Sequence, residues 1–238
     1  MVQEKIYDLI ISDLHLGLSV CRTDDALGVL ERYDFERLLI LGDLFDGSHA
    51  LISPSHLAVL DRIRVCSRGD GCDVVWVPGN HDFARYLCLA DAFGARVQEG
   101  PFFWERDSSR LVAYHGHEFD HVLSSSLIPG FFASHGYPLL QWLDMRLFHF
   151  FVGNRHAQPL SSFAKFLADK VLRLSEQVAQ RAVCAARQHD CTHVLCGHTH
   201  IPMDKQFGLV RYINTGGFCE AEVTYATVSN VGVQLHSI

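Results

Sequence analysis

Short apolar runs that each end in a polar residue able to bind metal are the feature that most constrains how this chain can fold. Three of them, Tyr7–Ser12, Leu38–Leu41 and Val74–Val77, are apolar except at Asp8 and Ser12, which is typical of buried strands. The segments between them are about 25 to 35 residues long, which suits a helical crossover between parallel strands. Leu111–Tyr114 and His193–Cys196 are two more such runs. The sequence therefore predicts an α/β fold.

The connecting segments and the end of the chain agree with this fold class. Asp24–Tyr33 and Pro54–Val65 carry apolar residues at helical spacing and are expected to be crossover helices. A longer helix is expected to begin at Ser161, after which apolar side chains recur near the 3.6-residue period. Glu222–Tyr225 and Val231–His236 alternate polar and β-branched residues, which predicts antiparallel strands.

Length and charge limit the domain organisation and the possible partners. With 238 residues, the chain is expected to form a single domain, 1–238, with an insertion at 119–190. Its formal net charge is −7, and its 20 basic residues are mostly Arg. This balance does not favour a broad basic surface, so we expect neither duplex nucleic acid as a partner nor a nuclease of the DNA-repair type.

Cysteine usage and the N-terminus indicate a compartment. The eight cysteines form no Cys-x-x-Cys pair, and the first residues lack the apolar stretch of a secretion signal. No apolar run reaches the ~20 residues that span a bilayer. We therefore expect a reduced, cytoplasmic protein.

The polar residues that follow the strands point to a metal site. They are Asp13 and His15, Asp43, Asn80 to Asp82, His115 and His117, and His198 and His200, with Asn214 after a weaker segment. Loops at the carboxyl ends of strands converge in an α/β sheet, so these side chains are expected to meet. Each motif alone is common in turns, but the ordered set indicates a site for two divalent ions. Mixed oxygen and imidazole donors favour manganese, iron or zinc over magnesium or calcium.

In this order, Asp-x-His, Gly-Asp, Gly-Asn-His-Asp, His-Gly-His and Gly-His-x-His resemble the motifs of the calcineurin-like metallophosphoesterase family. The resemblance extends from Tyr7 to Asn214. It implies a four-layer αββα sandwich with a di-metal site between two sheets and a helical insertion between the fourth and fifth motifs. It also implies hydrolysis of a phosphoester by attack of a metal-activated hydroxide on phosphorus.

The family resemblance also implies a role for each site residue. Carried over by position, it places one ion on Asp13, His15, Asp43 and His200, and the other on Asp43, Asn80, His115 and His198. Asp43 is the bridge, which requires ions about 3.5 to 4 Å apart. His81 is implied to protonate the leaving oxygen or bind the substrate phosphate, and Asp82 to orient its ring. We expect Mn²⁺, with iron or zinc as the alternatives.

Two segments are similar to the UDP-2,3-diacylglucosamine pyrophosphohydrolase group of lipid A synthesis within that family. His115–Asp120 resembles its His-Gly-Asp-x-Phe-Asp stretch, and Tyr212–Glu220 resembles the Tyr-x-Asn-x-Gly-Asp-Trp-x-Glu ending of its relatives. That group also has an apolar helical insertion at the position of 119–190. The resemblance implies a pyrophosphohydrolase that acts on UDP-2,3-diacylglucosamine or a similar lipid-linked nucleotide.

The apolar segment 137–152 is where acyl chains are expected. It is too short to cross a membrane, but it is long enough to cap an apolar pocket or to lie against a lipid surface at the inner face of the membrane. A core or dimer-interface role for the segment stays open. We expect substrate contacts from His117, Phe148, Phe151 and Arg155.

Three positions depart from the lipid A group and leave other functions open. The best-known enzymes of that group have Arg at the position of His81, Asp at that of His117, and Asp-Trp at that of Gly217–Phe218. The first alternative is a metallophosphodiesterase or phosphomonoesterase that acts on a soluble nucleotide substrate. The second is a non-catalytic binding module that uses the same fold.

Overall fold

The computed structural model describes residues 3–47, 51–69, 71–120 and 159–238. The chain divides into two compact units, one formed by Met1–Glu118 with Ala179–Ile238 and the other by Phe119–Val178. All the strands of the described residues lie in the first unit. This unit therefore positions the site, while the expected single domain with its insertion at 119–190 stays a prediction.

Six strands form the first sheet, in the order β11-β10-β1-β2-β3-β4. Strands β1 to β4 are parallel, and β10 pairs with β1 antiparallel, with Leu9 opposite Leu38 on one side and Thr227 on the other. The strands are β1 (Glu4–Ile11), β2 (Tyr33–Leu41), β3 (Asp73–Val77), β4 (Ala95–Val97), β10 (Thr224–Ser229) and β11 (Gly232–Ser237).

Five strands form the second sheet, in the order β5-β6-β7-β9-β8. The central strands β6, β7 and β9 are parallel, and the edge strands β5 and β8 pair antiparallel to their neighbours. The strands are β5 (Phe102–Arg106), β6 (Ser109–Ala113), β7 (His193–Cys196), β8 (Met203–Phe207) and β9 (Val210–Asn214).

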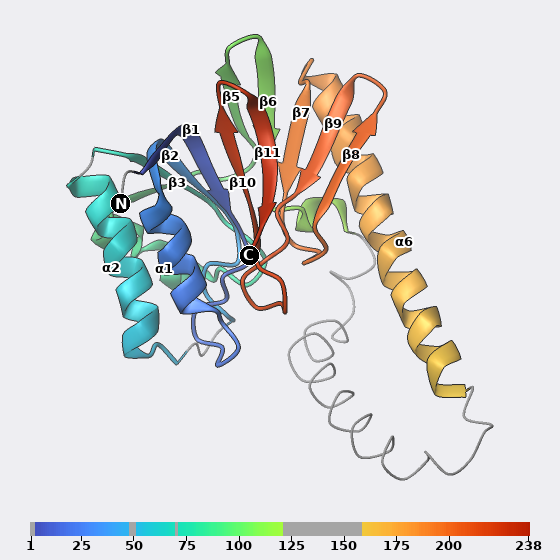
Figure 1. The fold of residues 1–238 in the computed structure, drawn as a ribbon, viewed down its shortest axis with the longest axis horizontal. Coiled ribbons are helices and arrows are strands. Elements are labelled where there is room, and N and C mark those ends of the chain that lie inside the picture. Colours follow the sequence, from blue (N-terminus) through green and yellow to red (C-terminus); the bar gives the residue numbers. More distant parts are fainter. Residues whose placement is uncertain (1–2, 48–50, 70, 121–158) are drawn as a thin grey trace. The chain divides into compact units, whose positions relative to one another are not determined.

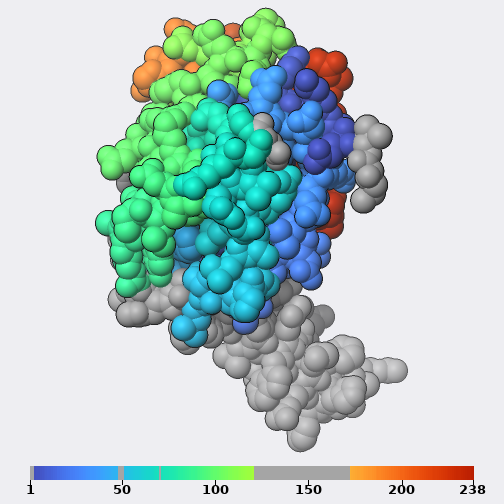
Figure 2. Space-filling view, turned by 90° about the vertical axis from the view of Figure 1, so that its left-hand side faces the viewer, coloured from blue at the N-terminus to red at the C-terminus, as the bar shows by residue number. Residues whose placement is uncertain are grey.

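Two helices cover the outer face of the first sheet (Figure 1). They are α1 (Thr23–Arg32) and α2 (Pro54–Arg68), and their buried side chains, such as Leu30 and Ile63, share one apolar core with Leu38 of β2. Ser53 starts α2 with a capping box, in which its hydroxyl and the ring of His56 each bind the other residue's backbone. Figure 2 shows α2 exposed between α1 and the chain that follows β3.

A second apolar core lies between the two sheets. Ile10, Leu39 and Val75 of the first sheet pack with Leu195 and Ile213 of the second. These side chains alternate along their strands with those that face the helices, as expected for a sheet that is buried on both sides. The site therefore stands on a rigid double-sheet scaffold.

The C-terminal end of the helix α6 (Pro159–Gln188) lies against the second sheet. Near its C-terminal end, Arg187 donates to the Phe207 carbonyl of β8, and the ring of His189 contacts Phe103 of β5. The mixed α/β architecture with two sheets and flanking helices confirms the predicted fold class. Shorter helical turns are α3 (Ala84–Leu87), η1 (Ala90–Phe93) and η2 (His117–Phe119).

The elements expected from apolar periodicity are all present. The five buried strands, the two crossover helices, the helix after Ser161 and the antiparallel C-terminal pair are confirmed. The edge strands β4, β5 and β8 were not expected. They are short and only partly buried, and so lack the apolar pattern on which the expectation depended.

Candidate metal centre

The loops that follow β1, β2, β6 and β7 are held together by backbone hydrogen bonds. The His15 amide donates to the Asp43 carbonyl at 2.9 Å, and the Gly197 amide donates to the His115 carbonyl at 2.8 Å. The amide of Phe218, beyond β9, donates to the Asp13 carbonyl at 3.1 Å and joins the two sets of loops. The carboxyl ends of the parallel strands of both sheets therefore meet at one place.

The site residues have unusual backbone conformations. Among the described residues, five of the seven non-glycine residues with positive φ belong to the predicted metal ligands. Such conformations cost energy in L-residues and persist only where surrounding contacts impose them. The five are Asp13, His15, Asp43, His198 and His200. The surrounding structure therefore imposes the backbone conformation that places these five side chains.

Two glycines leave the space that the carboxylates occupy. A Cβ atom at Gly79 would overlap the Asp43 carboxylate, and one at Gly197 would overlap the carboxylate of Asp13. Each loop therefore has glycine where a neighbouring loop places a buried acid. This explains the Gly-Asn-His-Asp and Gly-His-Thr-His motifs by packing as well as by chemistry.

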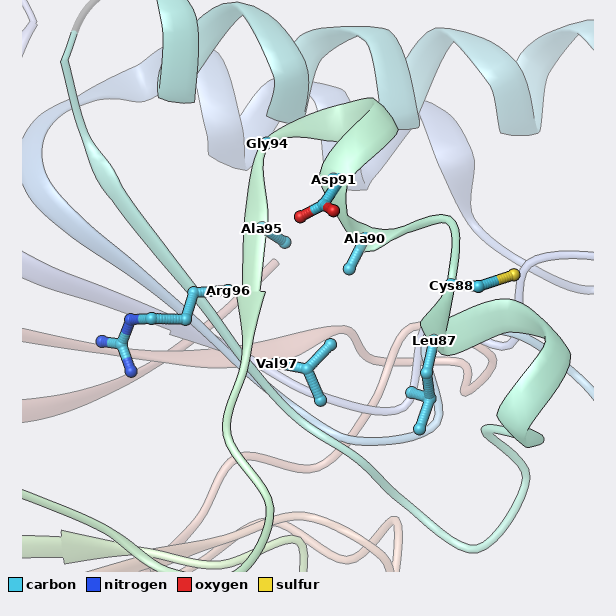
Figure 3. A pocket seen from close by; sticks show the side chains of 8 residues that line it. All are labelled: Leu87, Cys88, Ala90, Asp91, Gly94, Ala95, Arg96 and Val97. Carbon is cyan, nitrogen blue, oxygen red and sulfur yellow. The ribbon is translucent and has the colours of Figure 1, made fainter.

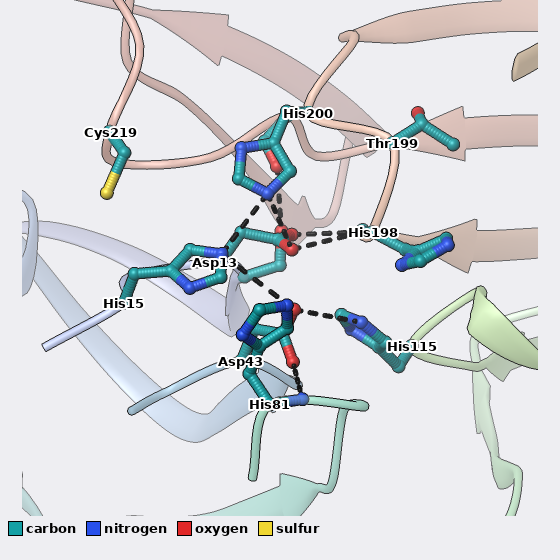
Figure 4. Close-up of polar contacts among 12 residues, drawn as sticks. Asp13, His15, Asp43, His81, His115, His198, Thr199, His200 and Cys219 are labelled. Atoms are coloured by element: carbon teal, nitrogen blue, oxygen red, sulfur yellow. Dashed lines mark hydrogen bonds and ion pairs between the residues drawn. The ribbon is translucent and has the colours of Figure 1, made fainter. Parts of the chain in front are cut away.

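One group of ligand atoms comes from the loops after β1 and β7. Nε2 of His15 and Nε2 of His200 lie 3.2 Å apart, and Nε2 of His200 lies 3.4 Å from Oδ1 of Asp13 (Figure 4). Ligand atoms of these three residues all lie within 4.8 Å of one another, which is a spacing that one ion can satisfy.

A second group comes from the loops after β2, β3 and β6. Nε2 of His115 lies 3.4 Å from Oδ2 of Asp43 and 3.2 Å from Oδ1 of Asn80. The same Oδ2 of Asp43 lies 3.8 Å from Nε2 of His15, which belongs to the first group. One carboxylate oxygen of Asp43 thus stands between the two groups, where a bridging ligand is required.

Three of the histidines are oriented by their other ring nitrogen. In each, Nδ1 is bound by a carbonyl or carboxylate oxygen, and Nε2 faces the other ligand atoms of the site. The partners are the Leu41 carbonyl at 2.8 Å for His115, Glu220 at 3.0 Å for His200, and Asp46 at 3.2 Å for His15. This is the arrangement of metal-binding imidazoles, and the residues present therefore fit divalent ions.

The electrostatics of the cluster favour positive charge. Burial opposes protonation of His115, but the Asp43 carboxylate outweighs it and raises the pKa of His115 to about 10. Burial likewise opposes protonation of His200, while Asp13 and Glu220 raise its pKa to about 9. The acids of the site therefore stabilise a cation next to them, as a metal-binding cluster must.

His81 lies beside the two groups, at the edge of the cluster. Its backbone amide donates to Oδ1 of Asp43 at 2.8 Å, and its Nδ1 lies 3.4 Å from Oδ1 of Asp46. The ring is about one-third exposed. Asp46 thus contacts Nδ1 of both His81 and His15, and ligand atoms of these three residues form a third compact group.

Asp82 contacts the turn that carries His81. Its carboxylate accepts hydrogen bonds from the indole of Trp76 and the amides of Gly79 and Phe45. The ion-pair contact of the His81 ring is with Asp46, not with the Asp82 expected from the resemblance. Asp82 therefore positions His81 through the backbone of its turn, and its part in catalysis stays a prediction.

His198 and His117 lie next to the second group. The ring centroid of His198 lies 5.2 Å from that of His115, and the His198 amide donates to the Asp13 carboxylate at 3.0 Å. The His117 ring lies 5.3 Å from His115, and its Nδ1 lies 3.5 Å from Glu118. Among the described residues, the compact groups of acidic and histidine ligand atoms are Asp13 with His15 and His200, His15 with Asp46 and His81, and Asp13 with Asp43 and His115, and none of them includes His198. Its role as a ligand stays a prediction.

Asp46 and Glu220 were not expected as site residues. Both orient a predicted ligand rather than follow a strand directly. The spacing of Asp46, three residues after Asp43, was the available signal. Glu220 was noted only as part of the segment that resembles the lipid A group.

The expected lipid contacts cannot be placed. Phe148, Phe151, Arg155 and the segment 137–152 lie outside the described residues.

A separate hollow of about 460 Å³ lies beside β4 and is lined by side chains between Leu87 and Val97 (Figure 3). None of the predicted metal ligands lines it. Within the described ranges, no helix has the length and apolar character needed to cross a membrane.

A sequence model of the calcineurin-like phosphoesterase family matches residues 9–202, a range that includes all the predicted metal ligands, from Asp13 to His200. The chain belongs to the calcineurin-like phosphoesterase family. The protein is therefore a metal-dependent phosphoesterase. A curated relative in the family, the UDP-2,3-diacylglucosamine hydrolase of Aeromonas hydrophila, is 26% identical over 213 residues, 84% of each chain.

Solved structures support the same fold for this calcineurin-like phosphoesterase. Yfce, a phosphoesterase from E. coli, superposes with a TM-score of 0.51 at 18% identity and covers 94% of this chain and 88% of its own. An archaeal phosphodiesterase superposes with a TM-score of 0.51 at 15% identity, and the match covers 97% of this chain and 98% of the archaeal one. Vps29 of Chaetomium thermophilum superposes with a TM-score of 0.50 at 12% identity, and the match covers 97% of this chain and 94% of Vps29. At these identities the likeness concerns the fold alone.

Proposed function

We propose that this phosphoesterase binds two divalent ions and cleaves the pyrophosphate bond of UDP-2,3-diacylglucosamine or of a similar lipid-linked nucleotide. The observation that carries the two-ion proposal is the position of Asp43, whose Oδ2 lies 3.8 Å from His15 Nε2 and 3.4 Å from His115 Nε2. The lipid-linked substrate is supported by the name of the Aeromonas relative and by the two sequence segments similar to its group. Contact of segment 137–152 with acyl chains or with a membrane surface stays a prediction.

The proposed ligands fall into two sets that share Asp43. Three imidazoles with bound Nδ1 atoms and two buried carboxylates suit manganese, with iron or zinc as the alternatives. One set is Asp13, His15, Asp43 and His200, and the other is Asp43, Asn80, His115 and His198.

The protein's own groups can bind and protonate the substrate beside the ions. Two ions held there would stabilise negative charge on the phosphoryl oxygens and lower the pKa of a coordinated water. The His81 ring is part-exposed at the edge of the cluster, with Nδ1 directed to Asp46. Its Nε2 is therefore available to bind a phosphate oxygen or to donate a proton to the leaving oxygen.

A second candidate is hydrolysis of a soluble phosphodiester or phosphomonoester. The observation that favours it is His81 itself, since the best-known enzymes of the lipid A group have Arg at that position. A part-exposed imidazole next to the cluster suits general acid catalysis on a range of leaving groups. The two candidates share the site and differ only in the substrate.

The experiment is a hydrolysis assay with purified protein, Mn²⁺ and UDP-2,3-diacylglucosamine in detergent. We expect release of UMP, and no release after chelation or from the variant Asp43→Ala. The matched control Asp204→Ala removes an exposed carboxylate of β8 and should keep full activity. Absence of UMP with manganese, iron and zinc would contradict the lipid-linked substrate. Rapid, detergent-independent hydrolysis of p-nitrophenyl phosphates would then establish the soluble alternative.

A further inference from the structure

Two loops that flank the metal centre are joined by hydrogen bonds and carry a pair of neighbouring cysteines, Cys21 and Cys219. The Arg22 amide donates to the Phe218 carbonyl at 2.8 Å, and the Arg22 guanidinium donates to the Ala221 carbonyl at 2.6 Å. These bonds join the residues next to Cys21 and Cys219, so the two thiols lie close enough for each to shift the pKa of the other. Both are free thiols in the structure.

The pair lies close to residues of the metal centre. Sγ of Cys219 lies 3.5 Å from the carbonyl oxygen of Leu14, the residue between Asp13 and His15. The residue after Cys219 is Glu220, which binds Nδ1 of His200. A change at this pair would therefore act on backbone that is adjacent to the first group of ligands.

The surroundings of these thiols differ from those of the other cysteines. Cys21 and Cys219 are part-exposed, whereas Cys66 and Cys72 are buried, and burial raises the pKa of Cys72 to about 12. The neighbouring Cys219 thiol lowers the pKa of Cys21. Two part-exposed thiols on adjacent, hydrogen-bonded loops, one of them with a lowered pKa, have the features of an oxidisable dithiol.

We propose that Cys21 and Cys219 are a redox-active pair that a peroxide converts to an intramolecular disulfide beside the metal centre. The Cys21 thiolate attacks one peroxide oxygen, forms an S–O bond and releases hydroxide as the O–O bond breaks. The Cys219 thiol then attacks the Cys21 sulfenic acid, the S–S bond forms and water leaves. In total, two thiols and one hydrogen peroxide give one disulfide and two water molecules.

The expected product can be identified by peptide mapping. Full-length protein is treated with a few equivalents of hydrogen peroxide, alkylated and digested with trypsin without reduction. Tryptic peptides 6–22 and 212–238 each contain a single cysteine, Cys21 and Cys219. We expect one disulfide-linked peptide pair, 6–22 with 212–238, in the monomer band of a non-reducing gel, and we expect dithiothreitol to separate it.

The matched control is the variant Cys88→Ser/Cys184→Ser, which removes two exposed thiols. It should give the same linked peptides in the same yield, whereas Cys21→Ser should give none. The proposal is overturned if peroxide oxidises Cys21 or Cys219 to separate sulfinic acids without the linked pair. It is also overturned if the pair occurs only in a dimer band. Neither result depends on the substrate, so failure here would leave the proposed function untouched.

Discussion

At the scale of single residues, the site depends on carboxylates that each bind several neighbours. Asp43 accepts the His81 amide with Oδ1 and faces His15 and His115 with Oδ2. Asp46 contacts the Nδ1 atoms of His15 and His81. Each of these side chains has a different set of partners. Single substitutions should therefore show which residues bind metal and which act only in turnover.

Replacement of the shared carboxylate should remove both ions. In Asp43→Ala, neither ligand group keeps its common oxygen, so we expect the metal content measured by plasma mass spectrometry to fall from two equivalents towards zero. His200→Ala is the comparison, since it removes a ligand from one group only and should leave one equivalent. Retention of one tightly bound ion by Asp43→Ala would contradict bridging.

Replacement of His81 should affect chemistry rather than metal binding. Its ring lies at the edge of the cluster, and we assign it to proton donation or phosphate binding. His81→Ala should lower kcat by roughly 10²- to 10⁴-fold with both ions still present. Loss of metal in this variant would show that His81 is a ligand instead.

Asp46 should act on metal affinity through His15. Groups that bind the outer nitrogen of a metal-binding imidazole commonly change affinity about 10- to 100-fold when removed. We therefore expect Asp46→Asn to weaken metal binding by about this factor in a competition titration with a fluorescent chelator. Asp61→Asn, which alters an exposed pair with Arg64 on α2, is the matched control and should bind metal normally.

At the scale of elements, a buried acid joins the two sheets. Asp8 of β1 is fully buried and accepts hydrogen bonds from the Trp104 indole at 3.0 Å and from the Arg106 guanidinium at 2.9 and 3.1 Å, both on β5. Arg37 of β2 adds a fourth contact at 3.3 Å. The relative position of the sheets therefore depends on a charged contact as well as on the apolar core.

Loss of this contact should destabilise the fold without changing the site chemistry. Asp8→Ala leaves the Trp104 indole and the Nε and Nη2 atoms of Arg106 without their acceptor, so we expect the free energy of unfolding to fall by about 3 kcal/mol. Asp73→Ala removes an exposed partner of Arg37 and should cost less than about 1 kcal/mol. Urea unfolding of both variants measures the difference. Equal, small losses would mean that Asp8 contributes little to joining the sheets.

At the scale of the whole molecule, the ions should stabilise the fold that positions them. The ligands come from loops of both sheets, so ions bind the folded chain and not the unfolded one. At free metal about 100 times the dissociation constant, one site contributes ~2.7 kcal/mol, which corresponds to a rise in Tm of roughly 5 to 10 °C. Calorimetry with Mn²⁺ and then with a chelator measures this shift. A Tm independent of metal would contradict a site built from both sheets.

The buried strands and the residues after them were predictable from the sequence because both signals are local. A strand buried on both faces requires an apolar run, as at the C-terminal ends of β1, β2 and β3, in residues 9–11, 38–41 and 74–77. The edge strands β5 and β8 were not predictable, since they are partly exposed and carry mixed residues. Their presence depends on pairing with neighbours.

The sequence by itself determined which ligand types follow each strand, and with them the α/β fold class and the phosphoesterase family. Only the tertiary structure decided how those ligands are oriented. Glu220 and His200 are 20 residues apart, His15 and Asp46 are 31 apart, and Cys21 and Cys219 belong to opposite ends of the chain. Contacts of this kind depend on the path of the backbone between the partners, which no local pattern of residues specifies.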